Sequence, residues 1–127
     1  MRKIALIIKR RPLAEGIIMA LKSKTADVFQ PYIIDDYRLA ETYIKQYMPD
    51  TAAVEIPETG ECTTACCLEL CRAVRRAAPG CRLLMICPEN VKDSVKAAMS
   101  AKKTNLIDDF VFYDASLNYI ASKIFSM

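Results

Sequence analysis

Short runs of apolar residues alternate along the whole chain with longer segments in which apolar residues recur at helical spacing. The runs predict five buried strands, near 4–8, 28–34, 52–56, 82–87 and 108–113. The segments between and after them predict five helices: one with Pro12 in its first turn, one within 35–48 that ends before Pro49, and others near 64–79, 89–103 and 115–125. We expect Leu39 and Leu117 on the buried faces of the second and fifth helices.

Strict alternation of strands and helices is typical of right-handed βαβ crossovers and a parallel sheet. The apolar runs are continuous rather than alternating, which indicates that helices cover both faces of the sheet. Pro31 interrupts the second strand and cannot donate to a ladder, so this strand belongs at an edge. The sequence therefore favours an α/β three-layer sandwich of the flavodoxin-like kind, with a five-stranded parallel sheet of order 2-1-3-4-5.

The composition is that of an ordinary globular domain, with 127 residues, 53% hydrophobic and 26% charged. We therefore expect one domain over residues 1–127. The first apolar run is too short for a signal-peptide core or a membrane span, and cations follow it directly. We expect a cytoplasmic protein that does not contact the membrane.

The chain contains no histidine, which excludes imidazole acid–base catalysis and histidine metal ligands. Its three glycines are scattered, so no glycine-rich phosphate loop follows the first strand, although a flavin held by side chains stays an alternative. The net charge of +3 does not imply nucleic-acid binding, and the arginines around the third helix are interpreted as a solvated face. We expect neither an enzyme nor a cofactor.

Six cysteines without a secretory context are interpreted as reduced thiols. Four of them, Cys62, Cys66, Cys67 and Cys71, form the pattern C-x₃-C-C-x₃-C. On one helix this spacing gives two pairs on faces about 100° apart, so a single tetrahedral metal ion does not reach all four. We expect small buried or half-buried thiols, with Cys62 in a loop and most reactive. A cysteine-based redox or metal sensor stays an alternative function.

Polar and charged residues follow the predicted strands where a parallel sheet presents its ligand-binding edge. They are Lys9, Arg10, Glu55, Cys87, Tyr113 and Asp114. In the type and spacing of PLAEGIIMAL, LAETYIKQYMPDTAAVEI, CLELCRAVRRAAPGCRLLMIC and DDFVFY, the whole chain resembles the CheY-like receiver domains of bacterial two-component response regulators.

The family's motif has an acidic pair after strand one, a phosphoacceptor aspartate at the end of strand three, Ser or Thr after strand four and Lys-Pro after strand five. By position, these places are held here by Lys9 and Arg10, by Glu55, by Cys87, and by Tyr113 with Asp114. Every chemical member differs, and the loop after strand three is longer. The resemblance therefore implies an atypical receiver, a pseudo-receiver with a degenerate phosphoacceptor pocket and no bound metal.

The family's chemistry requires Mg²⁺ held by carboxylates. Two like unit charges about 4 Å apart repel by about 4 kcal/mol at an effective dielectric of about 20, and a divalent ion doubles this. Our hypothesis is that Lys9 and Arg10 are counter-ions to Glu55 in place of the metal. Two alternatives stay open: solvated cations beside a decayed site, and a receiver still phosphorylated on Glu55.

The resemblance also implies an interaction face on helix four, strand five and helix five. Its candidate residues are Lys92, Lys96, Phe112, Tyr113 and Ser116. The expected function is a module without an output domain that acts in phosphorelay signal transduction by protein–protein interaction, independently of phosphorylation and Mg²⁺. The implied partner is a histidine kinase or a downstream effector, and the resemblance also allows homodimerisation through this face.

Overall fold

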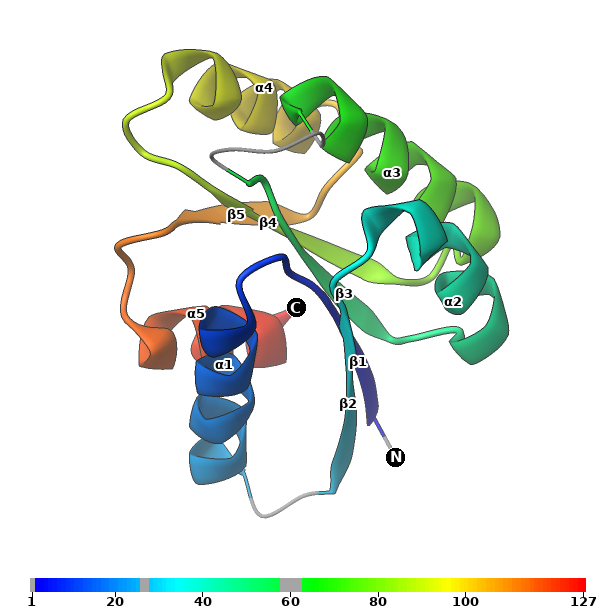
Figure 1. The fold of residues 1–127 in the computed structure, drawn as a ribbon, viewed down its shortest axis with the longest axis vertical. Coiled ribbons are helices and arrows are strands. Elements are labelled where there is room, and N and C mark those ends of the chain that lie inside the picture. Colours follow the sequence, from blue (N-terminus) through cyan, green and yellow to red (C-terminus); the bar gives the residue numbers. More distant parts are fainter. Residues whose placement is uncertain (1, 26–27, 58–62) are drawn as a thin grey trace.

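A single sheet lies between two layers of helices in the computed structural model, which describes residues 2–25, 28–57 and 63–127 (Figure 1). The strands are β1 (Arg2–Ile7), β2 (Phe29–Ile34), β3 (Thr51–Glu55), β4 (Arg82–Cys87) and β5 (Asp109–Phe112). The helices are α1 (Arg11–Lys24), α2 (Ala40–Tyr47), α3 (Thr64–Ala77), α4 (Lys92–Lys103) and α5 (Leu117–Ser126), with a 3₁₀ turn, η1 (Tyr37–Leu39), before α2.

All neighbouring strands are parallel, and their order is β2-β1-β3-β4-β5. This order confirms the predicted α/β fold with a flavodoxin-like sheet. Pro31 lies in β2 at the edge, where a missing N–H is tolerated. The connection after β1 leads to α1 on one face, and the connection after β3 leads to α3 on the other (Figure 1). The switch point of the sheet, where open parallel sheets usually bind ligands, therefore lies between the carboxyl ends of β1 and β3.

Alternate residues of each strand point to opposite faces and build two separate cores. One core joins the sheet to α2, α3 and α4, and includes Ile7, Val54 and Met85. The other joins the sheet to α1 and α5, and includes Leu6 and Ile86. All five side chains are fully buried, which explains why the strands appear in the sequence as continuous apolar runs.

The second helix is shorter than predicted, and one of its expected core residues is exposed. The Asp36 side chain accepts a hydrogen bond from the Arg38 N–H and caps η1, so α-helical geometry begins only at Ala40. Leu39 consequently lies outside the core with 46% of its surface exposed, while Ala40 and Ile44 are buried. The prediction for Leu39 was wrong because it extended the helical periodicity of α2 back through η1, which is not α-helical.

The other differences lie at the ends of elements, where sequence patterns are least informative. Val28 precedes β2 and is 69% exposed, although the sequence placed it in the strand. Leu117 was expected to be buried, but it is the first residue of α5 and is 41% exposed. Its side chain lies over Gly16 of α1, so it packs between the two helices rather than in the core.

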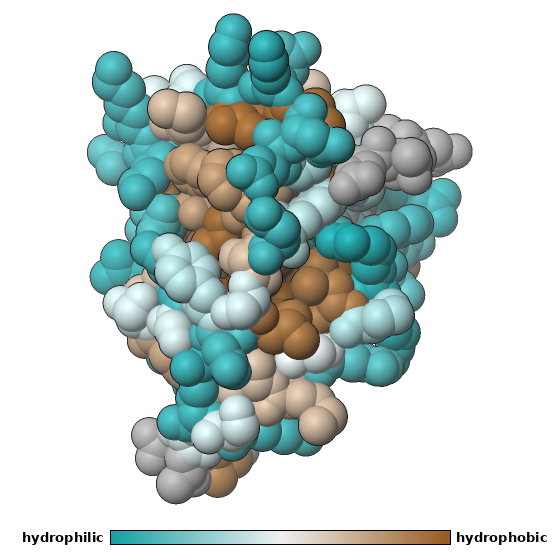
Figure 2. Space-filling model, turned by 90° about the vertical axis from the view of Figure 1, so that its left-hand side faces the viewer, coloured by the Kyte–Doolittle hydropathy of each residue, from teal (hydrophilic) through white to brown (hydrophobic). Residues whose placement is uncertain are grey.

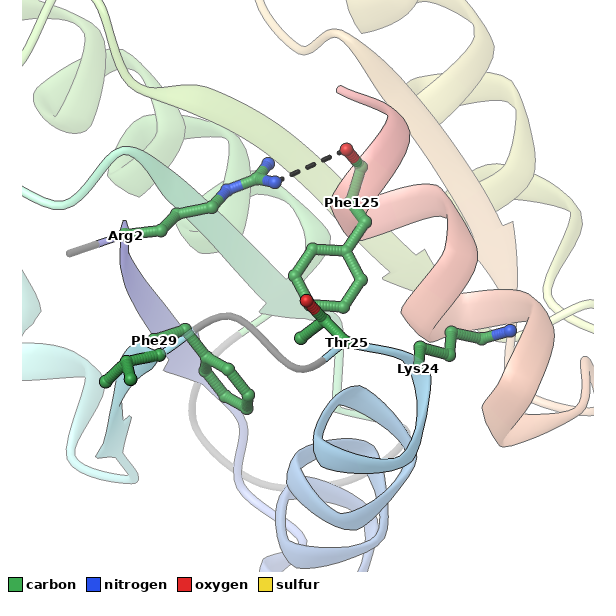
Figure 3. A pocket seen from close by; sticks show the side chains of 6 residues that line it. Arg2, Lys24, Thr25, Phe29 and Phe125 are labelled. Atoms are coloured by element: carbon green, nitrogen blue, oxygen red, sulfur yellow. Dashed lines mark hydrogen bonds between the residues drawn. The ribbon is translucent and has the colours of Figure 1, made fainter.

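Arg2 ties the C-terminal end of α5 to the start of the sheet. Its guanidinium donates to the carbonyl oxygens of Ile124 and Phe125, at 2.8 and 3.3 Å, and lies over the Phe125 ring (Figure 3). These carbonyls have no partner within the helix, so the cation supplies the missing donors. A pocket of about 370 Å³ lies beside this contact, lined by Arg2, Lys24, Thr25, Val28, Phe29 and Phe125 (Figure 3).

Asp108, just before β5, connects α3 to β4. Its carboxylate accepts hydrogen bonds from the Leu83 N–H and from Arg75, both at 2.8 Å, and Arg82 lies 3.5 Å away. Burial raises the pKa of Asp108, but these bonds and the nearby cations outweigh it, so the pKa lies below its usual value of 3.8. The ionised form is therefore preferred in the folded protein.

None of the helices in the described parts of the chain is long and apolar enough to cross a bilayer.

We expect Asp108→Asn to lower the free energy of unfolding at neutral pH by about 1–2 kcal/mol, because the pair with Arg75 is lost. A depressed folded-state pKa stabilises the protein above pH 3.8, and this contribution is lost as the pH falls further. Urea midpoints between about pH 5 and about pH 2.5 should therefore fall more steeply for the wild type than for the variant. Parallel curves would contradict this role of Asp108.

Candidate functional site

Glu55 ends the central strand β3 and is the only buried carboxylate among the described residues, with 1% of its surface exposed. Its Oε1 accepts hydrogen bonds from the backbone N–H groups of Lys9 and Arg10, at 2.8 and 3.2 Å. Its Oε2 accepts a hydrogen bond of 2.6 Å from Nε of the Arg10 guanidinium. The chain after β1 thus wraps around the carboxylate and compensates its charge, which a buried carboxylate requires.

The predicted ion pair between Glu55 and a cation after β1 is therefore present, and Arg10 supplies the cation. Lys9 contributes its backbone N–H, and its side chain is exposed. The chain bends at Lys9, so the backbone N–H groups of both residues point to the carboxylate, and only the Arg10 side chain also reaches it. The expectation that both cations face Glu55 is correct for Arg10 only.

Arg10 also reaches the fifth strand. Its guanidinium carbon lies 4.4 Å from the centroid of the Tyr113 ring, a cation–π contact. The Tyr113 N–H donates to the Cys87 carbonyl oxygen at 3.1 Å, so Tyr113 continues the pairing of β5 with β4. One half-exposed arginine, with 52% of its side chain accessible, thereby joins the ends of β1, β3 and β5.

Tyr37, which sequence reasoning missed, bridges the ends of β1 and β3. Its hydroxyl lies 2.6 Å from the carbonyl oxygen of Glu55 and 3.0 Å from that of Ile7. A single phenolic proton serves one carbonyl at a time, so the two acceptors share the donor. Tyr37 comes from η1, and no periodic pattern in the sequence pointed to it.

Cys87 is the last residue of β4, but its side chain does not reach the site. Its side chain is fully buried in the core beneath α3 and α4, and burial raises the pKa of its thiol to about 11. Cys67 is also buried, and its thiol lies 3.8 Å from the Glu55 carbonyl oxygen. The position that resembles the family's Ser or Thr is therefore occupied by an inert core thiol.

The remaining cysteines do not form a metal site within the described residues. Burial raises the pKa of Cys71 and of Cys81 to about 12, so both thiols stay protonated at neutral pH. Cys66 is exposed on α3. Cys62, predicted to be the most reactive thiol, lies outside the described residues. Among the described residues, no cluster of reactive thiols therefore supports the alternative function as a redox or metal sensor.

Two carboxylates flank the site on the side of β4 and β5. The hydrogen bond between Glu89 and Asp114 raises the pKa of Glu89 above its usual value. With Asn90 and Tyr113 these residues line a shallow depression of about 220 Å³. Asp114 was predicted at the strand ends, whereas Glu89 comes from the connection to α4 and carried no sequence signal.

The candidate interaction face lies on α4, β5 and the start of α5. Lys92, Lys96 and Ser116 are exposed, and Phe112 and Tyr113 are half-buried. Ser116 is also the N-cap of α5, where its hydroxyl accepts a hydrogen bond from a backbone N–H. Figure 2 views this side of the molecule and shows hydrophobic surface bordered by hydrophilic side chains.

No protein-family model and no curated protein matches the chain. Solved structures match almost its whole length. A CheY-like response regulator receiver domain protein from Methanospirillum hungatei JF-1 is 12% identical with a TM-score of 0.75, covering 99% of this chain and 92% of that one. An adenylate cyclase from Rhodopirellula baltica is 18% identical with a TM-score of 0.79, covering 98% and 85%. The chain has the CheY-like receiver fold.

A third match is described as a novel family of redox sensors in the streptococci evolved from two-component response regulators. It is 11% identical with a TM-score of 0.74, and the match covers 99% of this chain and 50% of that one. A cyclase and a redox sensor thus share the receiver fold with response regulators. At such low identity the likeness concerns the fold alone, so the function must be argued from the site.

We expect Arg10→Ala to lower the free energy of unfolding by about 1–3 kcal/mol, because the Glu55 carboxylate then stays buried with only two backbone donors. Lys9→Ala is the matched control, since it removes the neighbouring cation but keeps the N–H that Glu55 needs. Its effect should stay within about 0.5 kcal/mol. Denaturant midpoints measure both, and equal effects would contradict a specific role for the Arg10 pair.

Proposed function

We propose that the chain is a receiver-like signalling module that acts through protein–protein contacts and requires neither aspartyl phosphorylation nor Mg²⁺. The observation that carries this proposal is the ion pair between Arg10 and Glu55 at the end of β3. Support also comes from the receiver fold, which the chain shares with response regulators. The proposal makes the pocket a fixed structural element rather than a phosphorylation site.

The donor set around Glu55 argues against a divalent cation. Mg²⁺ needs oxygen ligands in octahedral geometry, and receiver pockets supply them mainly as carboxylates. Both Glu55 oxygens already accept hydrogen bonds, and the guanidinium stands against Oε2 at 2.6 Å. A divalent ion placed there would displace Arg10 and be repelled by it, at several kcal/mol for charges about 4 Å apart. The residues present therefore do not fit the metal of the family.

The same arginine connects the pocket to the proposed interaction face. Tyr113 belongs to that face and stacks against the guanidinium that Glu55 holds. The position of the Tyr113 ring is thus set by a contact that exists without any phosphoryl group. We propose that the face on α4, β5 and α5 is permanently in one conformation.

The chemistry of this face suggests its partner. Lys92 and Lys96 are exposed cations on α4, and Val91 and Tyr119 are partly exposed apolar residues, at 39% and 50%. A partner with an apolar centre and acidic residues at its rim would be complementary. We propose a cytoplasmic signalling protein, either a histidine kinase or a downstream effector, and a second copy of the chain as an alternative occupant.

The proposal includes no catalytic step, cofactor or nucleic acid. It also takes residues 1–127 as one domain.

Incubation with acetyl phosphate and Mg²⁺ tests the proposal directly. We expect the intact mass to stay unchanged, because Glu55 is buried and paired and no metal neutralises an incoming phosphoryl group. A conventional receiver domain in the same tube serves as the positive control. Gain of one phosphoryl mass, lost in Glu55→Gln, would contradict the proposal and favour a receiver that is phosphorylated on Glu55.

A further inference from the structure

A groove of about 400 Å³ follows the free edge of the sheet between β2 and α2. Its walls come from Pro31 and Ile33 of β2, and from Tyr43 and Tyr47 of α2. Because β2 and β5 are opposite edges of the sheet, the groove is remote from the interaction face proposed above. A ligand bound in this groove would therefore not cover that face.

Three tyrosines are already stacked along this groove. The Tyr32 and Tyr47 rings lie 4.5 Å apart at 18°, and the Tyr43 and Tyr47 rings 6.0 Å apart at 11°. All three are half-buried, and none of their hydroxyls has a hydrogen-bond partner within the described residues. The groove thus presents ordered ring surface together with three available phenolic donors.

The free edge of β2 is not suited to the addition of another strand. The Ile34 carbonyl accepts a hydrogen bond from the Ile8 N–H, so Ile34 faces β1, and alternate residues of β2 face outward. Pro31 is one of the outward residues and has no N–H. An added strand would lose a ladder hydrogen bond in the middle of this edge, so a ligand that needs few backbone donors is favoured.

Two carboxylates lie at one end of the groove. Asp35 is exposed, and Asp36 forms an ion pair with Arg38. That pair is weak because the Arg38 side chain is 85% exposed, so another cation can exchange with it. The groove is therefore aromatic along its length and acidic at its end.

We propose that this groove binds a proline-rich segment of a partner protein in the polyproline II conformation, with an arginine or lysine beside the prolines. Such a segment has no internal hydrogen bonds and offers its carbonyls to donors, which the tyrosine hydroxyls supply. Proline rings pack on aromatic surfaces, and the cation pairs with Asp35 and Asp36. The rings are ordered before binding, which reduces the entropic cost of association.

The probe is a blocked peptide with one arginine followed by a short polyproline run, titrated into the ¹⁵N-labelled full chain. We expect amide shift changes confined to β2, η1 and α2. A peptide with the same arginine followed by alanines has the same charge without the polyproline conformation, and we expect it to bind at least about five-fold more weakly. Asp35→Asn should weaken binding about two-fold at low salt only.

Tyr47→Leu should reduce the affinity at least about five-fold, since it removes the central ring of the stack. Tyr43→Leu tests the same point if the first variant loses its native spectrum. Met19→Leu, on the exposed face of α1, is the control and should bind like the wild type. Absence of shift changes, equal binding of the alanine peptide, or changes that map to α4, β5 and α5 would overturn the proposal.

Discussion

A carboxylate buried at the end of a central strand must have its charge compensated. The groups that compensate the charge of Glu55 determine how the strand ends are arranged. Glu55 takes two backbone donors and one guanidinium from the connection between β1 and α1. The compensation is intramolecular, so it does not depend on an ion or a ligand. It ties the connection after β1 to the end of β3.

Two aromatic residues then depend on the same arrangement from opposite sides. Tyr37 bridges the carbonyl ends of β1 and β3, and Tyr113 stacks on the arginine that Glu55 holds. The place where an open parallel sheet usually receives a ligand is therefore filled by side chains of the chain itself. This arrangement agrees with the proposal of a module whose surfaces are set by the fold.

Most of the fold could be predicted because the core imposes a period on the sequence. Strand positions followed from continuous apolar runs, and the sheet order followed from Pro31, which has to lie at an edge. The site could be predicted only in outline. The identity of the strand-end residues was available, but side-chain direction was not, since it depends on the turn after Ile8. Hence Arg10 rather than Lys9 pairs with Glu55, and the Cys87 thiol lies in the core. Tyr37 sits in an irregular turn, where no periodicity marks a functional residue.

A Mg²⁺ titration followed by calorimetry tests most directly whether Arg10 occupies the place of a cation. The wild type is compared with Arg10→Asp, which replaces the cation beside Glu55 by a carboxylate. We expect no binding to the wild type at millimolar Mg²⁺ and measurable binding to the variant, because two carboxylates then meet at the end of β3. Binding of Mg²⁺ to the wild type that is lost in Glu55→Gln would contradict this expectation.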